Sequence, residues 1–319
     1  MSKAALDRKM EQLEALRSAP SMEPLRKALN DRSNYFVSKA AALVAELGML
    51  DLIPDLTRAF DRFMIDPVKS DPQCWAKNAI AKALKDLGYS DADFFLCGVK
   101  HFQLEPVWGG TVDTAPTLRG ACALALVTCP LPRLEILETL ADLLAADPAK
   151  TVRADAAVAI AQLSGPDSAL LLRFKALSGD LEPEVVGQCL TSLLEVSSGY
   201  IPFVARFLDS KIEDIPHEAA AALGGCSDAS AVAILKERYH AKPDPIFARA
   251  ILLSLAASRH RDAADFLLQV IAEGEFDHAS HARQALAASR FQEDYRDRAT
   301  RAIRARADSK LFAQRPYTP

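Results

Sequence analysis

Apolar and small residues recur along the chain at a spacing that predicts amphipathic helices. From Val152, such residues follow four, five, eight and eleven positions later, at Ala156, Ala157, Ile160 and Leu163. These positions share one face of an α-helix, because a turn takes about 3.6 residues. The segment TVRADAAVAIAQL, residues 151–163, therefore predicts a helix with one buried face.

The same spacing returns at intervals of 30 to 42 residues, which indicates an internal repeat. The eight anchor positions are Phe36, Ala76, Leu118, Val152, Val185, Ile215, Ile246 and Ser280. Second apolar segments lie between anchors, at 51–63, 133–147, 167–177, 200–210 and 262–274. Each unit is then a helix pair that must stack on its neighbours to bury its apolar face. No alternating strand pattern competes, so we expect an all-α fold, an α-solenoid of about eight stacked helix pairs.

The repeat also sets the expected organisation of the chain. We expect an N-terminal capping helix over 1–20, the repeat array over 21–290, and a basic C-terminal cap and tail over 291–319. The least repetitive stretch is HFQLEPVWGGTVDTAP, residues 101–116, which lengthens one step between anchors. We expect a loop there with an exposed Trp-Gly-Gly turn. An alternative is that Trp108 covers a gap in the core where the spacing changes.

The anchored helix resembles the second helix of HEAT repeats, which begins with Val-Arg, continues with paired alanines and ends near Leu-Gly. TVRADAAVAIAQL, TLRGACALAL (117–126) and AKNAIAKALKDLG (76–88) carry this pattern. With its short period, the array is most similar to bacterial HEAT-like repeats of the type also found in phycobilisome bilin lyases. The resemblance covers about residues 21–290 and implies an architecture, because such repeats serve many functions.

The arginine of this pattern is missing from the last four repeats, so a regular arginine ladder would be confined to the first half of the chain. We expect Arg153 to link one repeat to the next and Asp155 to face the groove lined by the anchored helices. On this interpretation, the two residues are structural and not a catalytic pair.

Composition narrows the classes of function. The formal net charge is −4 and the pI is about 5.9, which argues against nucleic acid as a partner. The first twenty residues carry charges throughout, unlike a signal peptide. No segment reaches the roughly 18 uncharged apolar residues of a membrane helix. We expect a soluble, cytoplasmic protein without a membrane partner.

No motif indicates catalysis, a metal site or a cofactor. Four of the six cysteines, Cys122, Cys129, Cys189 and Cys226, occupy core positions of the repeat and are interpreted as small hydrophobic residues. His278 and His281 could share a helix face as metal ligands, but Asp277 as a helix cap before them is the preferred interpretation. His217 and Glu218 are assigned to a first helical turn. We therefore expect no catalytic residue, no metal and no cofactor.

Solenoids bind partners along the groove of stacked helices, which is predicted here to be small and weakly polar. The loop at 101–116 adds an aromatic side chain and glycines that permit close approach. The candidate partner-binding residues are Glu105, Trp108, Gly109, Gly110, Asp113, Arg119, Asp155 and Gln188. A basic stripe at Arg298, Arg301 and Arg304 could hold an acidic peptide or a phosphate backbone, or be a solvated face of a capping helix.

Three hypotheses follow. The leading one is a non-catalytic scaffold or adaptor that binds a protein or peptide through the groove and the loop at 101–116. The resemblance alone suggests the second, a lyase or chaperone subunit for a bilin-like chromophore. The third, DNA binding as in alkylpurine glycosylases with HEAT-like repeats, needs a basic groove that the middle repeats lack.

Overall fold

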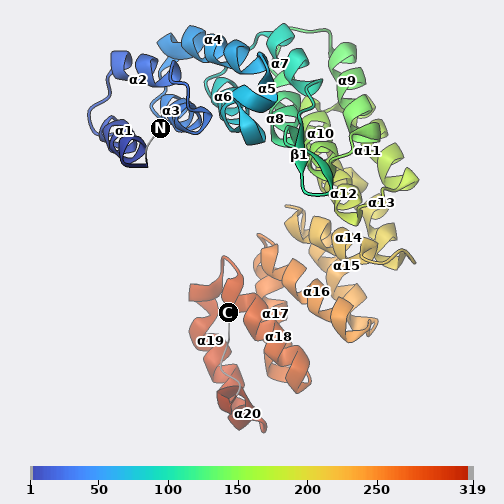
Figure 1. The fold of residues 1–319 in the computed structure, drawn as a ribbon. Coiled ribbons are helices and arrows are strands. Elements are labelled where there is room, and N and C mark those ends of the chain that lie inside the picture. Colours follow the sequence, from blue (N-terminus) through green and yellow to red (C-terminus); the bar gives the residue numbers. More distant parts are fainter. Residues whose placement is uncertain (1–2, 315–319) are drawn as a thin grey trace. The chain divides into compact units, whose positions relative to one another are not determined.

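The structure of the chain, a computed structural model, describes residues 3–314 and consists mainly of helices (Figure 1). The ends of the first and last predicted segments, residues 1–2 and 315–319, lie outside the described residues. The helices form two compact units, Met1–Leu163 and Ser164–Pro319. Within each unit the expected helix pairs are present, so the prediction of an all-α helical-repeat fold is confirmed.

In the first unit, four anchored helices stack directly on one another in chain order. They are α3 (Asn34–Glu46), α6 (Trp75–Asp86), α8 (Pro116–Leu126) and α10 (Lys150–Leu163). Their companions are α2 (Met22–Leu29), α4 (Ile53–Met64), α7 (Ala92–Val99) and α9 (Arg133–Ala146). A short turn of helix, η1 (Leu50–Leu52), precedes α4, and two more, α5 (Pro67–Ser70) and η2 (Pro72–Cys74), lie between α4 and α6.

The second unit repeats this arrangement with α12 (Pro183–Val196), α14 (Ile215–Gly225), α16 (Pro245–Ala257) and α18 (Phe276–Ala288) as its stacked row. The companion helices are α11 (Gly165–Ser178), α13 (Ile201–Ala205), α15 (Ala229–His240), α17 (Arg261–Glu273) and α19 (Gln292–Ala305). The turns η3 (Ser198–Tyr200) and η4 (Arg206–Asp209) flank α13, and α20 (Ser309–Gln314) follows α19. All eight predicted anchors therefore fall in or at the start of separate helices.

The core is built from the predicted columns of small and aliphatic side chains. In α10, Val152, Ala156, Ala157 and Ile160 are fully buried. The four cysteines assigned to core positions are buried as well. Burial raises the pKa of the Cys189 thiol to about 12, which disfavours the reactive thiolate. Their interpretation as small hydrophobic residues is confirmed.

The register predicted for the last two anchored helices was wrong. Ile246 is 75% exposed, and the buried column of α16 begins one residue later, at Phe247, and continues through Ile251 and Leu255. Because positions 246 and 247 are both apolar, the spacing alone fits either start. In α18 the buried Ala282 and Leu286 place the start of the column at His278 instead of Ser280.

The expected helix cap at Asp277 was also wrong. Glu275 occupies the N-cap of α18, and Asp277 lies inside the first turn. The Nδ1 atom of His278 lies 2.7 Å from the hydroxyl of Tyr239 on α15. Among the described residues, no three potential metal ligands come together. By contrast, His217 and Glu218 lie in the first turn of α14, as predicted.

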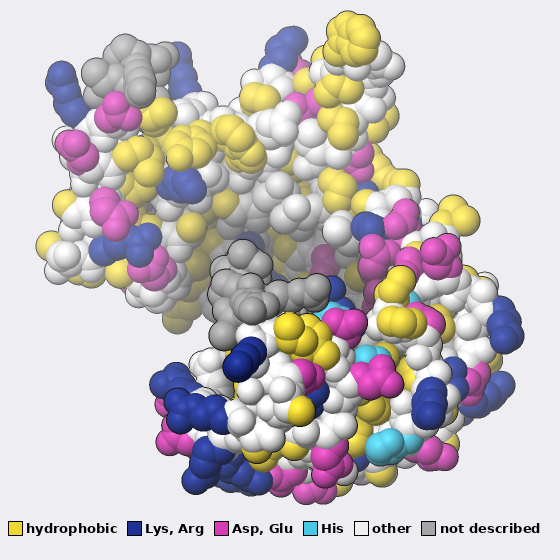
Figure 2. All heavy atoms as spheres, turned by 90° about the horizontal axis from the view of Figure 1, so that it is seen from below, with side chains coloured by type: hydrophobic (Ala, Val, Ile, Leu, Met, Phe, Trp, Pro, Cys, Tyr) yellow, Lys and Arg dark blue, Asp and Glu magenta, His cyan; other side chains and the backbone are white. Residues whose placement is uncertain are grey.

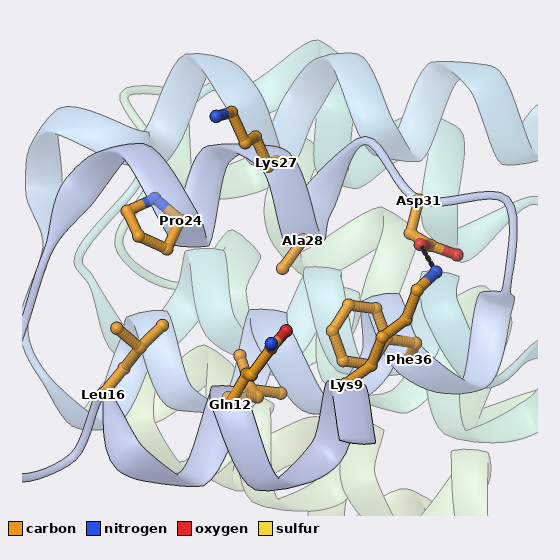
Figure 3. Close-up of a pocket in the computed structure, with 9 residues that line it drawn as sticks. Lys9, Gln12, Leu16, Pro24, Lys27, Ala28, Asp31 and Phe36 are labelled. Atoms are coloured by element: carbon orange, nitrogen blue, oxygen red, sulfur yellow. Dashed lines mark hydrogen bonds and ion pairs between the residues drawn. The ribbon is translucent and has the colours of Figure 1, made fainter. Parts of the chain in front are cut away.

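The first helix, α1 (Lys3–Ala15), packs loosely on α2 and α3 (Figure 3). A pocket of about 240 Å³ lies between these helices. Lys9 forms an ion pair with Asp31, and its ammonium also lies 5.5 Å from the ring centre of Phe36. The ion pair between Lys9 and Asp31 thus joins α1 to the first repeat beside a pocket that apolar side chains do not fill.

Candidate partner-binding hairpin

The segment expected as a loop at 101–116 contains a two-stranded antiparallel hairpin. Strand β1 (Leu104–Val107) pairs with β2 (Gly110–Asp113), and Val107 opposite Gly110 closes the ladder. Trp108 and Gly109 form the two-residue turn, and Gly109 has a φ of 89°, which glycine adopts without steric cost. The predicted Trp-Gly-Gly turn is present and carries strands on both sides.

Glu105 holds one side of the base of the hairpin. Its buried carboxylate accepts hydrogen bonds from the backbone N–H of Gln73 at 2.6 Å and from the side chains of Gln103 and Thr114, each at 2.7 Å. Burial alone would raise the pKa of Glu105, but the hydrogen bonds from Thr114, Gln103 and Gln73 outweigh it and lower the pKa. The ionised carboxylate therefore fastens β1 to the loop before α6.

Asp113 and Arg119 hold the other side. The guanidinium of Arg119 is fully buried and donates to Asp113 at 2.7 Å and to the carbonyl of His101 at 3.1 Å. Its remaining nitrogens donate to both carboxylate oxygens of Asp147, at 2.7 and 3.0 Å. Burial lowers the pKa of Arg119, but the hydrogen bonds to Asp147 and Asp113 raise it overall. One arginine thus joins the hairpin, α8 and the next repeat.

The loop that receives Glu105 has an unusual backbone. Gln73 and Cys74 have φ values of 64° and 53°, in the left-handed region that costs a side-chain-bearing residue about 1 kcal/mol or more. This conformation accompanies the hydrogen bond from the Gln73 N–H to the Glu105 carboxylate. The base of the hairpin is therefore tied to a strained turn as well as to buried charges.

The rest of the hairpin presents apolar side chains to solvent. Trp108 at the tip is fully exposed, which rules out the alternative that it fills a gap in the core. The other apolar side chains that are at least two-fifths exposed are Phe102, Leu104, Val107 and Val112. Within 104–112 the single charged residue is Glu105, whose carboxylate is buried at the base. The exposed surface is thus mainly apolar and carries no charge.

The eight candidate residues therefore have different environments. Trp108, Gly109 and Gly110 lie exposed at the turn, whereas Glu105, Asp113 and Arg119 hold its base. Their binding of a partner stays a prediction. Sequence reasoning missed the supporting contacts of Gln73, Gln103 and Thr114. The strand-favouring residues Val107, Thr111 and Val112 on either side of a Gly-containing turn were a signal for the hairpin.

The two groove candidates are half-buried. Asp155 on α10 lies directly over Gly120 on α8. A Cβ atom built on Gly120 would lie only 2.0 Å from Asp155 Oδ2, so the glycine makes room for the carboxylate. Burial raises the pKa of Asp155, and its carboxylate has no hydrogen bond or ion pair among the described residues. Gln188 on α12 donates to the hydroxyl of Ser192 at 3.2 Å.

The fold defines a helical-repeat protein. No protein-family model and no curated protein sequence matches the chain. It is similar to the complex of CpcE and CpcF of phycocyanin lyase from Nostoc sp. PCC7120, with 19% identity over 74% of this chain and 90% of that chain and a TM-score of 0.37. It is also similar to human deoxyhypusine hydroxylase in complex with glycerol, with 18% identity over 80% of this chain and 91% of that chain and a TM-score of 0.32. Values this low carry no argument about activity.

Among the described residues, no helix combines the length and apolar character needed to cross a membrane.

Proposed function

We propose that this chain is a non-catalytic scaffold that binds a protein partner by inserting Trp108 into an apolar pocket of that partner. The observation that carries the proposal is the fully exposed indole at the tip of a hairpin whose base is fixed by buried charges. Tryptophan is enriched among the residues that dominate binding energy. Gly109 and Gly110 leave room for the partner's backbone beside the indole.

Magnitudes favour a binding role for this side chain. A tryptophan can bury about 150–250 Å². At roughly 25 cal/mol per Å², its insertion contributes about 4–6 kcal/mol before entropic costs. The anchored base lowers those costs, because a preorganised hairpin loses little freedom on binding. The exposed tip carries no charge, so we expect binding to change little between low and high salt.

The test compares three full-length proteins: wild type, Trp108→Ala and Trp75→Ala. Trp75 is the only other tryptophan and is 47% exposed at the start of α6, so it controls for loss of an exposed indole. Partners captured from lysate of the native organism are purified and titrated against each protein. We expect Trp108→Ala to weaken binding at least tenfold and Trp75→Ala to leave it unchanged. Equal binding by Trp108→Ala, or an equal loss with Trp75→Ala, would contradict the proposal.

A spectroscopic measurement reports the contact directly. The variant Trp75→Phe leaves Trp108 as the single tryptophan. Its emission should match that of a fully hydrated indole and shift to shorter wavelength when the purified partner is added. An unchanged spectrum in a complex whose formation is verified independently would show that the tip stays in water.

The proposal of a bilin lyase or chromophore-chaperone subunit rests on the repeat resemblance alone. Addition of bilin to the full chain tests it by absorbance. An unchanged spectrum counts against that proposal and leaves the scaffold proposal intact.

A further inference from the structure

A pocket of about 370 Å³ lies between α18 and α19 in the second unit. Its apolar lining includes Leu286 and Ala287 of α18 and Ala299 and Ile303 of α19. Arg283 and Arg296 also line it, and no carboxylate does. Figure 2 shows Lys and Arg side chains on both sides of the C-terminal part, with Asp and Glu side chains among them.

The repeat shows what covers this face in the other anchored helices of the second unit. Counted from the start of each buried column, the tenth residue is Leu194 in α12, Gly224 in α14 and Ala256 in α16, and all three are buried. In each case the next anchored helix stacks on that face. The equivalent residue of α18, Ala287, is exposed. The pocket therefore lies at the position of the next helix of the row.

Among the described residues, the last helix, α20, covers part of this face. Its Phe312 packs against the ring of Phe276 at 4.8 Å and against the guanidinium of Arg283 at 5.4 Å, near the N-terminal half of α18. Along α19, the pocket-lining residues Tyr295, Ala299 and Ile303 step by four, which spans about 12 Å. That length matches about two turns of a docked helix.

The charges point to an acidic occupant. Arg296 has no hydrogen bond or ion pair from its side chain among the described residues, whereas its neighbour Arg298 pairs with Asp265 at 3.2 Å. A docked carboxylate would supply Arg296 with a charge-assisted partner. We propose that this pocket binds an acidic amphipathic helix of a protein partner, which adds one helix to the row of α12, α14, α16 and α18. The small side chains of Ala287 and Ala299 permit close helix packing.

The experiment uses the full chain and a fluorescent peptide of about five helical turns, a length at which isolated helices become marginally stable. Its leucines and alanines lie on one face and glutamates flank them; a scrambled peptide of the same composition lacks that face. We expect binding, measured by anisotropy, that weakens with salt. Arg296→Glu should weaken it at least tenfold, and so should Ala299→Arg, which fills the pocket.

The matched control is Arg304→Glu, an exposed arginine of α19 outside the lining, which should bind as wild type does. Trp108→Ala should also bind normally, so failure here is distinguishable from failure of the hairpin proposal. The inference is overturned if the peptide does not bind, if the scrambled peptide binds equally, or if Arg304→Glu loses as much affinity as Arg296→Glu. Self-association abolished by Ala299→Arg would make a second copy the occupant, and capture of anionic vesicles without peptide binding would make it a lipid surface; either outcome overturns it too.

Discussion

Single residues in the first unit show how charge is accommodated inside a helical repeat. Lys77 and Arg119 occupy the second position of their buried columns, and each pairs with an aspartate six residues earlier, Asp71 or Asp113. Arg153 has the equivalent place in α10 and donates to the backbone carbonyl of Asp147, whose carboxylate accepts from Arg119. Arg119 thus links its own repeat to the next one through Asp147, and the inter-repeat link expected for Arg153 stays a prediction.

Asp155 is a residue that we expect to destabilise the fold at neutral pH. Burial raises its pKa, so above that pKa the folded state bears the cost of a half-buried carboxylate without a partner. We expect Asp155→Asn to stabilise the protein at pH 7 by up to about 1 kcal/mol. The gain should shrink as the pH falls through the raised pKa, because wild-type Asp155 then becomes neutral too. Thermal unfolding at several pH values measures this.

Asp142→Asn is the control for Asp155→Asn, because Asp142 is an exposed aspartate on α9 of the same unit. We expect no change in stability from it. A stabilisation of the same size in both variants would mean that net charge, and not the site of Asp155, is responsible.

At the scale of one element, α16 allows a direct test of which residue, Ile246 or Phe247, begins its buried column. Phe247 is buried and its ring packs edge-on against His217 at 5.3 Å, whereas Ile246 is mostly exposed. We expect Phe247→Ala to lower the free energy of unfolding by about 3–5 kcal/mol through loss of buried surface and formation of a cavity. Ile246→Ala should change it by about 0.5 kcal/mol or less. Denaturant unfolding followed by circular dichroism compares them; a greater loss for Ile246→Ala would restore the register that the spacing first favoured.

This helix illustrates how far sequence predicts the elements. Periodicity located all eight anchored helices, because small residues at repeating positions leave few other ways to bury a face. It did not resolve the start of the buried column in α16, where the two adjacent apolar residues Ile246 and Phe247 fit the same spacing.

The hairpin shows the other limit of sequence reasoning. The exposure of Trp108 was predictable from the interrupted repeat, but the roles of Glu105 and Asp113 were not. Their partners, Gln73 and Arg119, come from segments before and after the hairpin, and only folding brings these together. Local patterns identify a segment that packing does not need; they do not identify what holds it in place.

At the scale of the whole molecule, the two units differ in how their carboxylates respond to acid. In the first unit, the pKa values of Asp31, Glu105 and Asp113 are lowered because hydrogen bonds and ion pairs outweigh the effect of burial. In the second unit, Asp228 and Asp308 also have lowered pKa values through hydrogen bonds from Ser230 and Arg306, but both side chains are partly exposed and solvent screens these contacts. Burial raises the pKa of Glu218, and Glu184 and Asp214 nearby add to that shift. A carboxylate whose pKa is lowered on folding stabilises the folded state at pH values above its pKa in the unfolded chain, and this stabilisation is lost as the pH falls through its pKa in the folded protein. A carboxylate whose pKa is raised on folding destabilises the folded state at neutral pH, and that cost disappears as the pH falls.

We therefore expect the first unit to unfold at a higher pH than the second. The loss of stability in the first unit should begin as the pH falls below about 4.5, the ordinary pKa of a glutamate. Among the described carboxylates of this unit, Asp155 acts in the opposite direction, because its pKa is raised. Incubation over a pH series, followed by a deuterium pulse at one fixed pH and mass spectrometry of peptides, measures protection in each unit separately. Peptides from residues 3–163 should lose protection before those from 164–314.

Two variants test whether the acid sensitivity of the first unit comes from the carboxylate of Glu105. Glu105→Gln removes a carboxylate with a lowered pKa, so it should reduce stability at pH 7 while making the first unit less sensitive to acid. Glu195→Gln changes an exposed glutamate of α12 and should alter neither unit. In repeat arrays, adjacent repeats stabilise each other through nearest-neighbour contacts, which couples their unfolding. Simultaneous loss of protection in both units, unaltered by Glu105→Gln, would show that coupling between repeats, and not the carboxylates at the hairpin base, sets the response of this protein to acid.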